Sequence, residues 1–207
     1  MQCSICRTRR PRRSCPALNA AICPPCCGEA REKTVDCPAH CGYLIEARQR
    51  EPLLEPDPAR IPNADYKLPD RIAEDHWPLL ACLASVIVTA VPGITDRAAL
   101  EALDCLIRTG RTLASGVIYE TPPSEPYARM LYVALQQAIQ RFRESELRDT
   151  GLVTTRDGDV LALLVLVQRF GLTRDNSRPL GRSFLYWLAQ IQPPELSASS
   201  SSSAILR

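Results

Sequence analysis

Apolar residues recur at helical spacing through the second half of the chain. Between residues 124 and 142 they return at intervals of three and four, while glutamines and an arginine occupy the opposite face. This pattern is typical of an amphipathic helix that packs on one side. Asp96 is placed to cap another such helix. The pattern predicts an all-α domain of about five helices over residues 77–192, with the other four helical segments at 79–91, 96–113, 160–170 and 179–191.

Two of the apolar segments have a second interpretation. Residues 85–91 and 163–167 are rich in β-branched or aliphatic side chains, which also favour strands. Neither segment shows turn-bounded alternation, so helices are the preferred interpretation. The segment 79–91 is almost wholly apolar, but it is shorter than the ~20 residues that a helix needs to cross a bilayer. We therefore expect no membrane partner.

Prolines and serines mark the segments outside this domain. Prolines at 52, 56, 58, 62, 69 and 78 exclude a long helix or a central strand, so residues 49–76 are predicted to be a proline-rich linker that lies over the helical domain. Residues 44–50 are expected to form a short helix before it. Residues 193–207 contain an unbroken run of serines, a composition that buries too little apolar surface to fold, so a disordered tail is expected there.

Cysteine is the unusual feature of the composition. The chain has ten cysteines, and eight of them fall within the first 41 residues. Clustered cysteines form either disulfides or metal sites, depending on the redox compartment. The chain starts MQCSICRTRRPRR, without the apolar stretch of a secretory signal, so a reducing, cytoplasmic location is expected, where paired thiolates bind zinc. Cys82 and Cys105 lie in apolar segments and are expected to be buried, unreactive thiols.

The spacing of the eight N-terminal cysteines predicts two zinc sites. Residues 3–6 and 23–26 are CxxC knuckles, in which a two-residue gap lets both sulfurs face one ion. The other four sulfurs form a second site, in an interleaved cross-brace. His40 is an alternative ligand in that second site. The predicted ligands are Cys3, Cys6, Cys23 and Cys26 for one Zn²⁺ and Cys15, Cys27, Cys37 and Cys41 for the other.

Both zinc sites are expected to be structural. A site saturated by four cysteines leaves no coordination position for a catalytic water. A segment of about 50 residues also buries too little surface to fold alone, so metal binding supplies its folding free energy. We therefore predict a zinc-binding domain over residues 1–48 and no catalytic residue. His76 precedes a predicted helix and is expected to pack or cap there rather than act as a base.

The cysteine pattern resembles that of a group of uncharacterised bacterial proteins. The stretch RSCPALNAAICPPCCGEAREKTVDCPAHCGYLIEAR is similar to their N-terminus, where CxxC is followed by CP, CxxCCG and CPxxC. More loosely it resembles treble-clef and HIT-type cross-braced fingers, which bind two zinc ions, although it lacks the third CxxC of the HIT type. Residues 175–185 also resemble an element of the bacterial chains. The resemblance implies a two-zinc finger and no established activity.

A basic segment lies between the first knuckle and Cys15. Its arginines can pair with phosphates, which predicts salt-sensitive nucleic-acid binding. They can equally balance the thiolates, because residues 1–50 hold nine Lys or Arg and four Asp or Glu, and two zinc ions with eight thiolates bring this segment to about +1. Tyr43 is the one aromatic residue in residues 1–50, so almost no ring is available to stack on a base. The candidate nucleic-acid ligands are Arg7, Arg9, Arg10, Arg12 and Arg13.

A second polar cluster follows the fourth predicted helix. Its residues suit a helix exit closed by Pro179, or else a site for an anion or a partner peptide. The sequence as a whole favours a non-enzymatic interaction or adaptor protein, whose helical domain binds a protein partner. The alternative is a nucleic-acid-binding or transcription-regulatory protein that uses the basic segment. The candidate anion or partner residues are Arg174, Asn176, Arg178 and Arg182.

Overall fold

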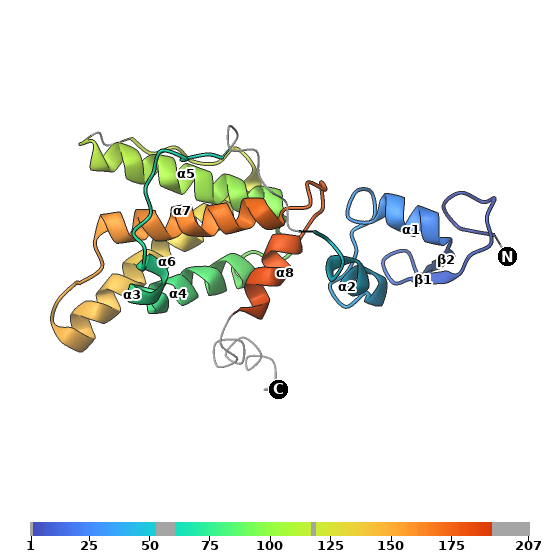
Figure 1. The fold of residues 1–207 in the computed structure, drawn as a ribbon, viewed down its shortest axis with the longest axis horizontal. Helices are drawn as coiled ribbons and strands as arrows, with labels where there is room; N and C mark the ends of the chain where they lie inside the picture. The colour runs from blue at the N-terminus through green and yellow to red at the C-terminus, as the bar shows by residue number, and fades with distance from the viewer. Residues whose placement is uncertain (1, 53–60, 117–118, 192–207) are drawn as a thin grey trace, which may run out of the picture.

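The periodic apolar segments fold as helices in the computed structural model, which describes residues 2–52, 61–116 and 119–191. A small N-terminal finger stands at one end of the molecule and a helical domain at the other (Figure 1). This mainly helical architecture confirms the predicted fold class. The predicted serine-rich tail lies outside the described residues. The elements are β1 (Arg13–Cys15), β2 (Ala20–Ile22), α1 (Pro24–Ala30), α2 (Gly42–Arg48), α3 (Ile72–Asp75), α4 (Trp77–Thr89), α5 (Asp96–Ala114), α6 (Pro126–Thr150), α7 (Asp157–Arg174) and α8 (Ser183–Gln190).

The finger, residues 2–48, is built around its cysteines. β1 and β2 form an antiparallel hairpin in which Cys15 pairs with Ala20, and α1 begins directly after Cys23. Pro24 occupies the first turn of α1, where its fixed φ suits a helix and its missing N–H costs nothing. Few aliphatic side chains of the finger are buried: Ile22 and Val35 among the cysteines, and Leu44 on α2. Such a small apolar core agrees with a fold that depends on metal.

The helical domain has a single apolar core. α5 packs against both α6 and α7, α4 packs against α6, and α8 contacts α4 and α7. α7 is buried on almost every side, because nearly all of its aliphatic residues from Val160 to Val167 face the core. Residues 85–91 belong mostly to α4 and residues 163–167 to α7, so the strand interpretation of these segments is wrong. The absence of turn-bounded alternation had favoured helices in both segments.

The helix ends differ from the predicted ones in an informative way. Thr95, not Asp96, caps α5, because its hydroxyl oxygen accepts a hydrogen bond of 3.3 Å from Ala98 N. The buried carboxylate of Asp96 instead accepts hydrogen bonds from the amides of Phe184 (3.0 Å) and Leu185 (3.1 Å). Asp96 therefore caps a different helix, α8, at the first-turn amides that have no partner of their own.

α6 starts later than the predicted stripe of residues 124–142 and also ends later. Glu125 is its cap, with its carboxylate accepting from Ala128 N. The helix continues to Thr150, beyond the last apolar residue of the predicted stripe, and ends at Gly151 with φ 75°. Residues 143–150 are polar except for the exposed Leu147 and include good helix formers, so the helix extends beyond the apolar stripe. Glycine tolerates the left-handed conformation that ends it.

Residues 61–71 of the predicted linker are held on the helical domain. Tyr66 and Leu68 pack against the core. Asn63 bonds to two arginines of the bundle: its side chain accepts from Arg111 Nη1 (3.0 Å) and its carbonyl from Arg169 Nη2 (3.0 Å). The prediction that the proline-rich segment lies over the helices therefore fits residues 61–71. Among the helices that the structure describes, none combines the length and the apolarity needed to span a membrane.

Candidate metal centre

One predicted cysteine quartet comes together as a compact cluster at the start of α1. Cys3 and Cys6 lie in the N-terminal knuckle, Cys23 directly precedes α1, and Cys26 lies in its first turn. All four sulfur atoms lie within 4.8 Å of one another, and Cys6 Sγ and Cys23 Sγ are 3.9 Å apart. Sulfur ligands of a tetrahedral zinc ion, each about 2.3 Å from the metal, lie about 3.8 Å from one another. The quartet therefore fits one metal ion.

The backbone of the knuckle holds these sulfurs in place. Arg7 takes a left-handed conformation with φ 54°, so that its amide donates to the carbonyl oxygen of Cys3 at 2.8 Å. The amide of Cys3 donates to the carbonyl oxygen of Arg9 at 2.9 Å. The amide of Cys23 donates to Cys3 Sγ at 3.2 Å, which joins the knuckle to the start of α1. Amides directed at sulfur favour the thiolate, the form that binds metal.

The pKa values of thiols in this quartet are shifted in opposite directions. A hydrogen bond from the Thr8 side chain, helped by backbone amides, lowers the pKa of Cys6 to about 5. Burial raises the pKa of Cys3, but amide hydrogen bonds from Cys6 and Cys23 outweigh it, so that this pKa is lowered. The pKa of Cys26 is raised to about 12, chiefly by the hydrogen bond of this thiol with Cys23 and next by burial. Four thiolates this close together need a cation between them.

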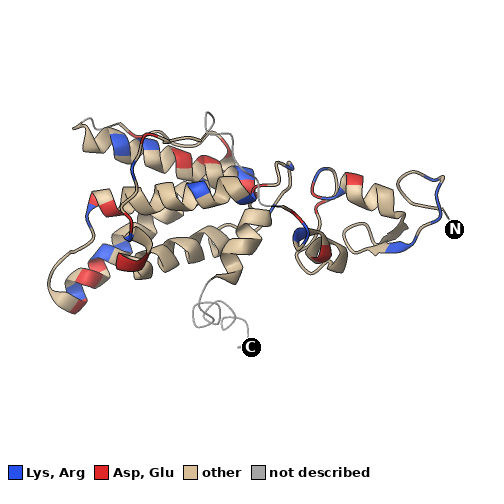
Figure 2. Cartoon of the chain, in the orientation of Figure 1, with Lys and Arg blue, Asp and Glu red and all other residues tan. Residues whose placement is uncertain are grey.

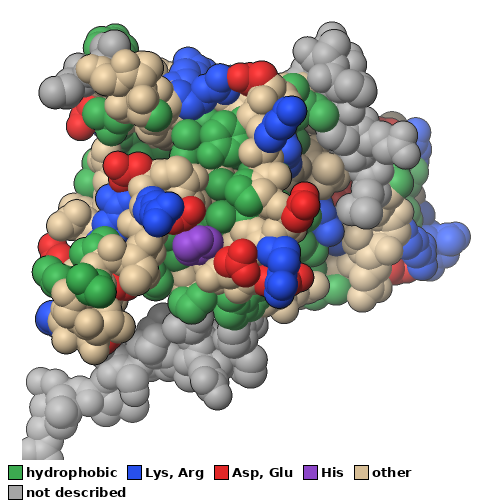
Figure 3. Space-filling view, turned by 60° about the vertical axis from the view of Figure 1, so that its left-hand side comes forward, with side chains coloured by type: hydrophobic (Ala, Val, Ile, Leu, Met, Phe, Trp, Pro, Cys, Tyr) green, Lys and Arg blue, Asp and Glu red, His purple; other side chains and the backbone are tan. Residues whose placement is uncertain are grey.

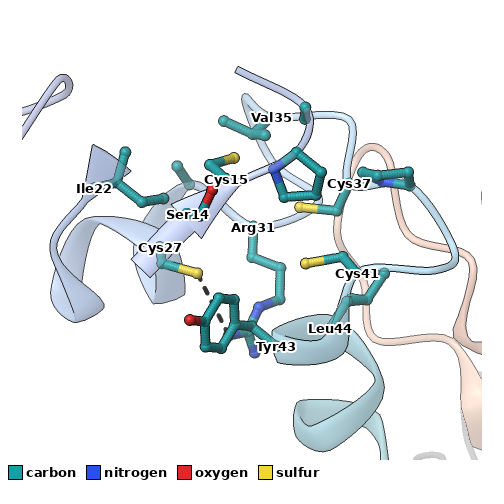
Figure 4. Close-up of a pocket in the computed structure, with 14 residues that line it drawn as sticks. Ser14, Cys15, Ile22, Cys27, Arg31, Val35, Cys37, Cys41, Tyr43 and Leu44 are labelled. Atoms are coloured by element: carbon teal, nitrogen blue, oxygen red, sulfur yellow. Dashed lines mark hydrogen bonds between the residues drawn. The ribbon is translucent and has the colours of Figure 1, made fainter. Parts of the chain in front are cut away.

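The second predicted quartet surrounds a small cavity. Cys15, Cys27, Cys37 and Cys41 line a space of about 20 Å³ between the hairpin and α2, and Figure 4 shows their side chains around it. One water-sized sphere needs about 10 to 15 Å³, so this cavity holds little more than one such sphere. In the described part of the chain only the first quartet has all its sulfurs within 4.8 Å, so the second is more open. Arg31 Nη2 donates to Cys27 Sγ at 3.9 Å.

The alternative ligand His40 lies outside this cavity. Its side chain is exposed, and it is absent from the lining of the cavity, which includes Cys37 and Cys41 on either side of it. The loop therefore turns the two cysteines inward and the histidine outward. Of the two remaining cysteines, Cys105 is buried and Cys82 is half-buried, and burial raises the pKa of both thiols. Thiols in that state are poor nucleophiles and poor metal ligands.

The comparisons with known proteins add no relative. No protein-family model matches the chain, no curated protein is similar to it, and no solved structure has a similar fold at a significant level.

The predicted nucleic-acid residues lie on the outer end of the finger. Figure 2 shows the basic residues of the knuckle at the end of the molecule away from the helical domain. Arg7, Arg10 and Arg12 are exposed. Arg9 is also exposed, and the nearby Cys23 sulfur raises the pKa of its guanidinium. Arg13 lies over the ring of Tyr43, with 4.6 Å from its guanidinium carbon to the ring centroid. The one aromatic residue of the finger thus already stacks on an arginine.

Glu32 is the functional residue that the sequence did not reveal. It is fully buried and has φ 50°. Its carboxylate accepts hydrogen bonds from Arg48 Nη2 (2.7 Å), Asn176 Nδ2 (2.9 Å) and the amide of Arg182 (3.2 Å). Its carbonyl oxygen accepts from the amide of Leu180 at 2.9 Å. Glu32 therefore connects the finger to the turn between α7 and α8.

The rest of this connection comes from the same short loop of the finger. Residues 31–36, which we call the docking loop, also include Arg31, whose carbonyl accepts from Arg178 Nη1 at 2.8 Å. Asp36 forms an ion pair with the guanidinium of Arg182. Three of the four predicted anion or partner residues, Asn176, Arg178 and Arg182, thus bond to the finger. What looked like an open polar cluster is largely an interface within the chain.

Proposed function

We propose that this chain is a zinc-stabilised, non-enzymatic interaction protein. The single observation that carries the proposal is the four-sulfur cluster of Cys3, Cys6, Cys23 and Cys26. Four thiolate ligands favour zinc and fill its tetrahedral coordination, which is the arrangement of structural rather than catalytic zinc. Three of the four residues are buried, as a structural site requires. The metal then stabilises a finger whose own apolar core is very small.

A second zinc ion between Cys15, Cys27, Cys37 and Cys41 belongs to the same proposal. The cavity between these residues has room for one ion, and their side chains surround it. Rotation of cysteine side chains is enough to bring sulfurs closer to a common centre. The order of elements in the finger, a knuckle, a hairpin and a helix with a CxxC at its start, also supports the treble-clef resemblance and its two-zinc cross-brace.

The helical domain supplies the interaction surface in this proposal. A groove of about 300 Å³ runs between α5, α6 and α7, and its lining includes Leu106, Leu113 and Ile139. Leu113 is 52% exposed at its edge, and Arg143 pairs with Asp157 beside it. Figure 3 shows hydrophobic side chains gathered between charged ones on a face of the molecule. Exposed apolar surface with a charged rim is typical of a site for a protein partner.

Metal analysis tests the first part of the proposal. We expect two zinc ions per chain in protein purified without added metal. Replacing Cys3 and Cys6 together by serine should remove one of them, and replacing Cys37 and Cys41 together should remove the other. Cys82→Ser, outside both quartets, is the control and should keep two. Iron instead of zinc, or full zinc content after loss of Cys3 and Cys6, would contradict the assignment.

A matched pair of leucine variants tests the interaction surface. Leu113 at the groove and Leu147 on the outer part of α6 are both 52% exposed, so a charge is tolerated equally at either position. A partner captured from the native cell with the full chain should be absent with Leu113→Asp and present with Leu147→Asp. If no captured protein depends on Leu113, the groove is not the partner site.

Nucleic-acid binding through the basic knuckle is the second candidate function. The observation in its favour is that Arg7, Arg9, Arg10 and Arg12 are exposed together at the free end of the finger. Removing one arginine that binds a phosphate should reduce the dependence of affinity on salt, by roughly one unit in the log–log slope for duplex DNA. Fluorescence anisotropy with generic DNA and RNA at 50 mM salt checks this, with Arg7, Arg10 and Arg12 replaced together by alanine. Equal binding of that triple variant would dismiss the basic segment.

A further inference from the structure

A cleft opens where the α7–α8 turn meets the finger. It has a volume of about 670 Å³, within the range of sites for small organic ligands. Its lining comes from Arg48 at the end of α2 and residues 49–52 on one side, and from the end of α7, the turn after it and α8 on the other. Figure 1 shows where these elements lie. Arg48 and Asn176, which both bond to the carboxylate of Glu32, line it, so the cleft depends on the docked finger. Its charged lining consists of Arg48, Glu51, Arg174, Asp175 and Arg178.

Arg174 is the cation that the docking contacts do not use. Its guanidinium carbon lies 3.7 Å from the centroid of the Trp187 ring, and its Nη1 donates to Thr173 Oγ1 at 3.2 Å. No carboxylate pairs with it among the described residues. Burial lowers the pKa of its guanidinium, which means that part of its hydration is lost without a compensating anion. A position in the last turn of α7 favours a positive charge, but it does not explain why the Arg174 side chain is half-buried.

Two other arginines of the cleft offer donors in the same space. Arg178 spends one nitrogen on the docking loop and has no ion pair among the described residues. Arg48 pairs with Glu32, and its guanidinium carbon lies 4.7 Å from the ring centroid of Tyr186. The Arg48 side chain is only 6% exposed, yet its buried Nε–H has no acceptor. A buried donor without an acceptor costs free energy that a ligand oxygen can recover.

The two acids of the cleft are already engaged with their neighbours. A carboxylate oxygen of Glu51 accepts from Ser183 Oγ at 2.9 Å, and one of Asp175 accepts from the amide of Ser177 at 3.0 Å. Burial raises the pKa of Asp175, which makes its charged form less favourable. Each acid is thus held by a hydrogen bond within the chain, whereas Arg174 has no carboxylate partner among the described residues.

We propose that this cleft binds a small organic anion through a phosphate or carboxylate group, with Arg174 as the principal cationic contact and Arg178 and Arg48 beside it. Guanidinium groups bind both kinds of oxyanion through charge-assisted hydrogen bonds. The cleft accepts the ligand's remaining atoms against Tyr186 and the amide side chains of Gln49 and Gln190. This site is separate from the metal centre and from the groove between α5, α6 and α7.

Trp187 provides the means to detect such binding. The chain has two tryptophans, so a Trp77→Phe background leaves Trp187, beneath Arg174, as the only one. The metal-loaded full chain is titrated at constant ionic strength with glycerol 2-phosphate, with succinate, and with glycerol as the neutral control. We expect a saturable change of Trp187 fluorescence with at least one anion, with Kd of ~1 mM or tighter, and none with glycerol. The two anions distinguish phosphate from carboxylate.

Variants at Arg174 decide whether the cation is responsible. Arg174→Gln should weaken binding about tenfold or more, and Arg174→Lys should keep most of it, because the positive charge remains. Arg148→Gln, in the exposed last turn of α6, is the matched control and should bind as the parent does. Calorimetry repeats the measurement without relying on fluorescence, and zinc content together with helical circular dichroism confirms that the finger and the helical domain of each variant are folded. No saturable response to either anion, an equal response to glycerol, or unchanged binding by Arg174→Gln would overturn the proposal.

Discussion

The carboxylate of Glu32 accepts a hydrogen bond of 2.9 Å from Asn176, a residue 144 positions later in the chain. Glu32 itself is fully buried, and the Arg48 side chain that pairs with it is 6% exposed. A buried carboxylate is tolerated only when it is paired and hydrogen-bonded on all sides, and here three donors satisfy it. The docking of the finger is therefore a specific contact through a buried, paired carboxylate.

Replacing Glu32 by glutamine should destabilise this interface. The amide cannot pair with Arg48, and its NH₂ group faces other donors, so we expect a loss of about 3 kcal/mol in the free energy of unfolding. Urea denaturation measures this loss, and small-angle scattering measures the release of the finger. Glu29→Gln, an exposed glutamate on α1, is the control. Equal stability of the two variants would show that the Glu32 contacts do not hold the finger.

Asp96 should make stability depend on pH. Burial raises the pKa of Asp96 to about 6, although the amides of Phe184 and Leu185 lower it in part, while the unfolded chain has a pKa near the ordinary value of about 4. The folded state thus holds a proton that the unfolded state has released. The contribution is present below pH 4 and is lost as the pH rises through 6, and it should fall by about 1 kcal/mol between pH 5 and pH 7.

The Asp96→Asn variant isolates this contribution. Low pH also releases zinc from thiolates, which acts in the opposite direction in both proteins. We therefore compare the free energies of unfolding of parent and variant at each pH, so that the effect of the metal cancels. The difference between them should change by about 1 kcal/mol in the parent's disfavour from pH 5 to pH 7. A difference that stays constant would mean that Asp96 is ionised throughout.

Replacing two glycines by alanine, one at the end of α6 and one at the start of α7, should change stability in opposite directions. Gly151 ends α6 with φ 75°, so Gly151→Ala should cost about 1 kcal/mol through backbone strain. Gly158 lies in the first turn of α7, where an added methyl group would have no atom within 4 Å, so Gly158→Ala should stabilise by up to about 0.5 kcal/mol. Thermal denaturation compares the two. A loss at both positions would mean that the α6–α7 connection does not tolerate change at all.

Removing the metal should unfold the finger and leave the bundle folded. The aliphatic core of the helical domain and the cysteine core of the finger are separate clusters. A strong chelator should therefore make the eight cysteines of the finger reactive towards a thiol reagent, while Cys105 stays protected and most of the helical circular dichroism signal remains. Readdition of zinc should restore protection. Loss of all helical signal on chelation would instead show that the bundle depends on the finger.

The sequence was most informative where local spacing decides the structure. The CxxC pairs at 3–6 and 23–26 predict one ligand set by themselves, because each pair is local. Apolar periodicity likewise predicted the helices. Glu32 and Asp96 were missed in their real roles because each acts on a segment far away in the chain: Glu32 on the turn after α7, Asp96 on α8. An acid between two cysteines or at a helix start carries no signal of such a distant partner.

The docking loop also couples metal binding to the docking of the finger. It runs from Arg31 to Asp36, between Cys27 and Cys37, which are both ligands of the proposed second ion. An ion that ties these two cysteines together also restricts the loop that carries Glu32. Binding of the ion and docking of the finger are then linked equilibria, and each must favour the other by the same factor. A cell short of zinc would thereby contain chains whose two domains are more often apart.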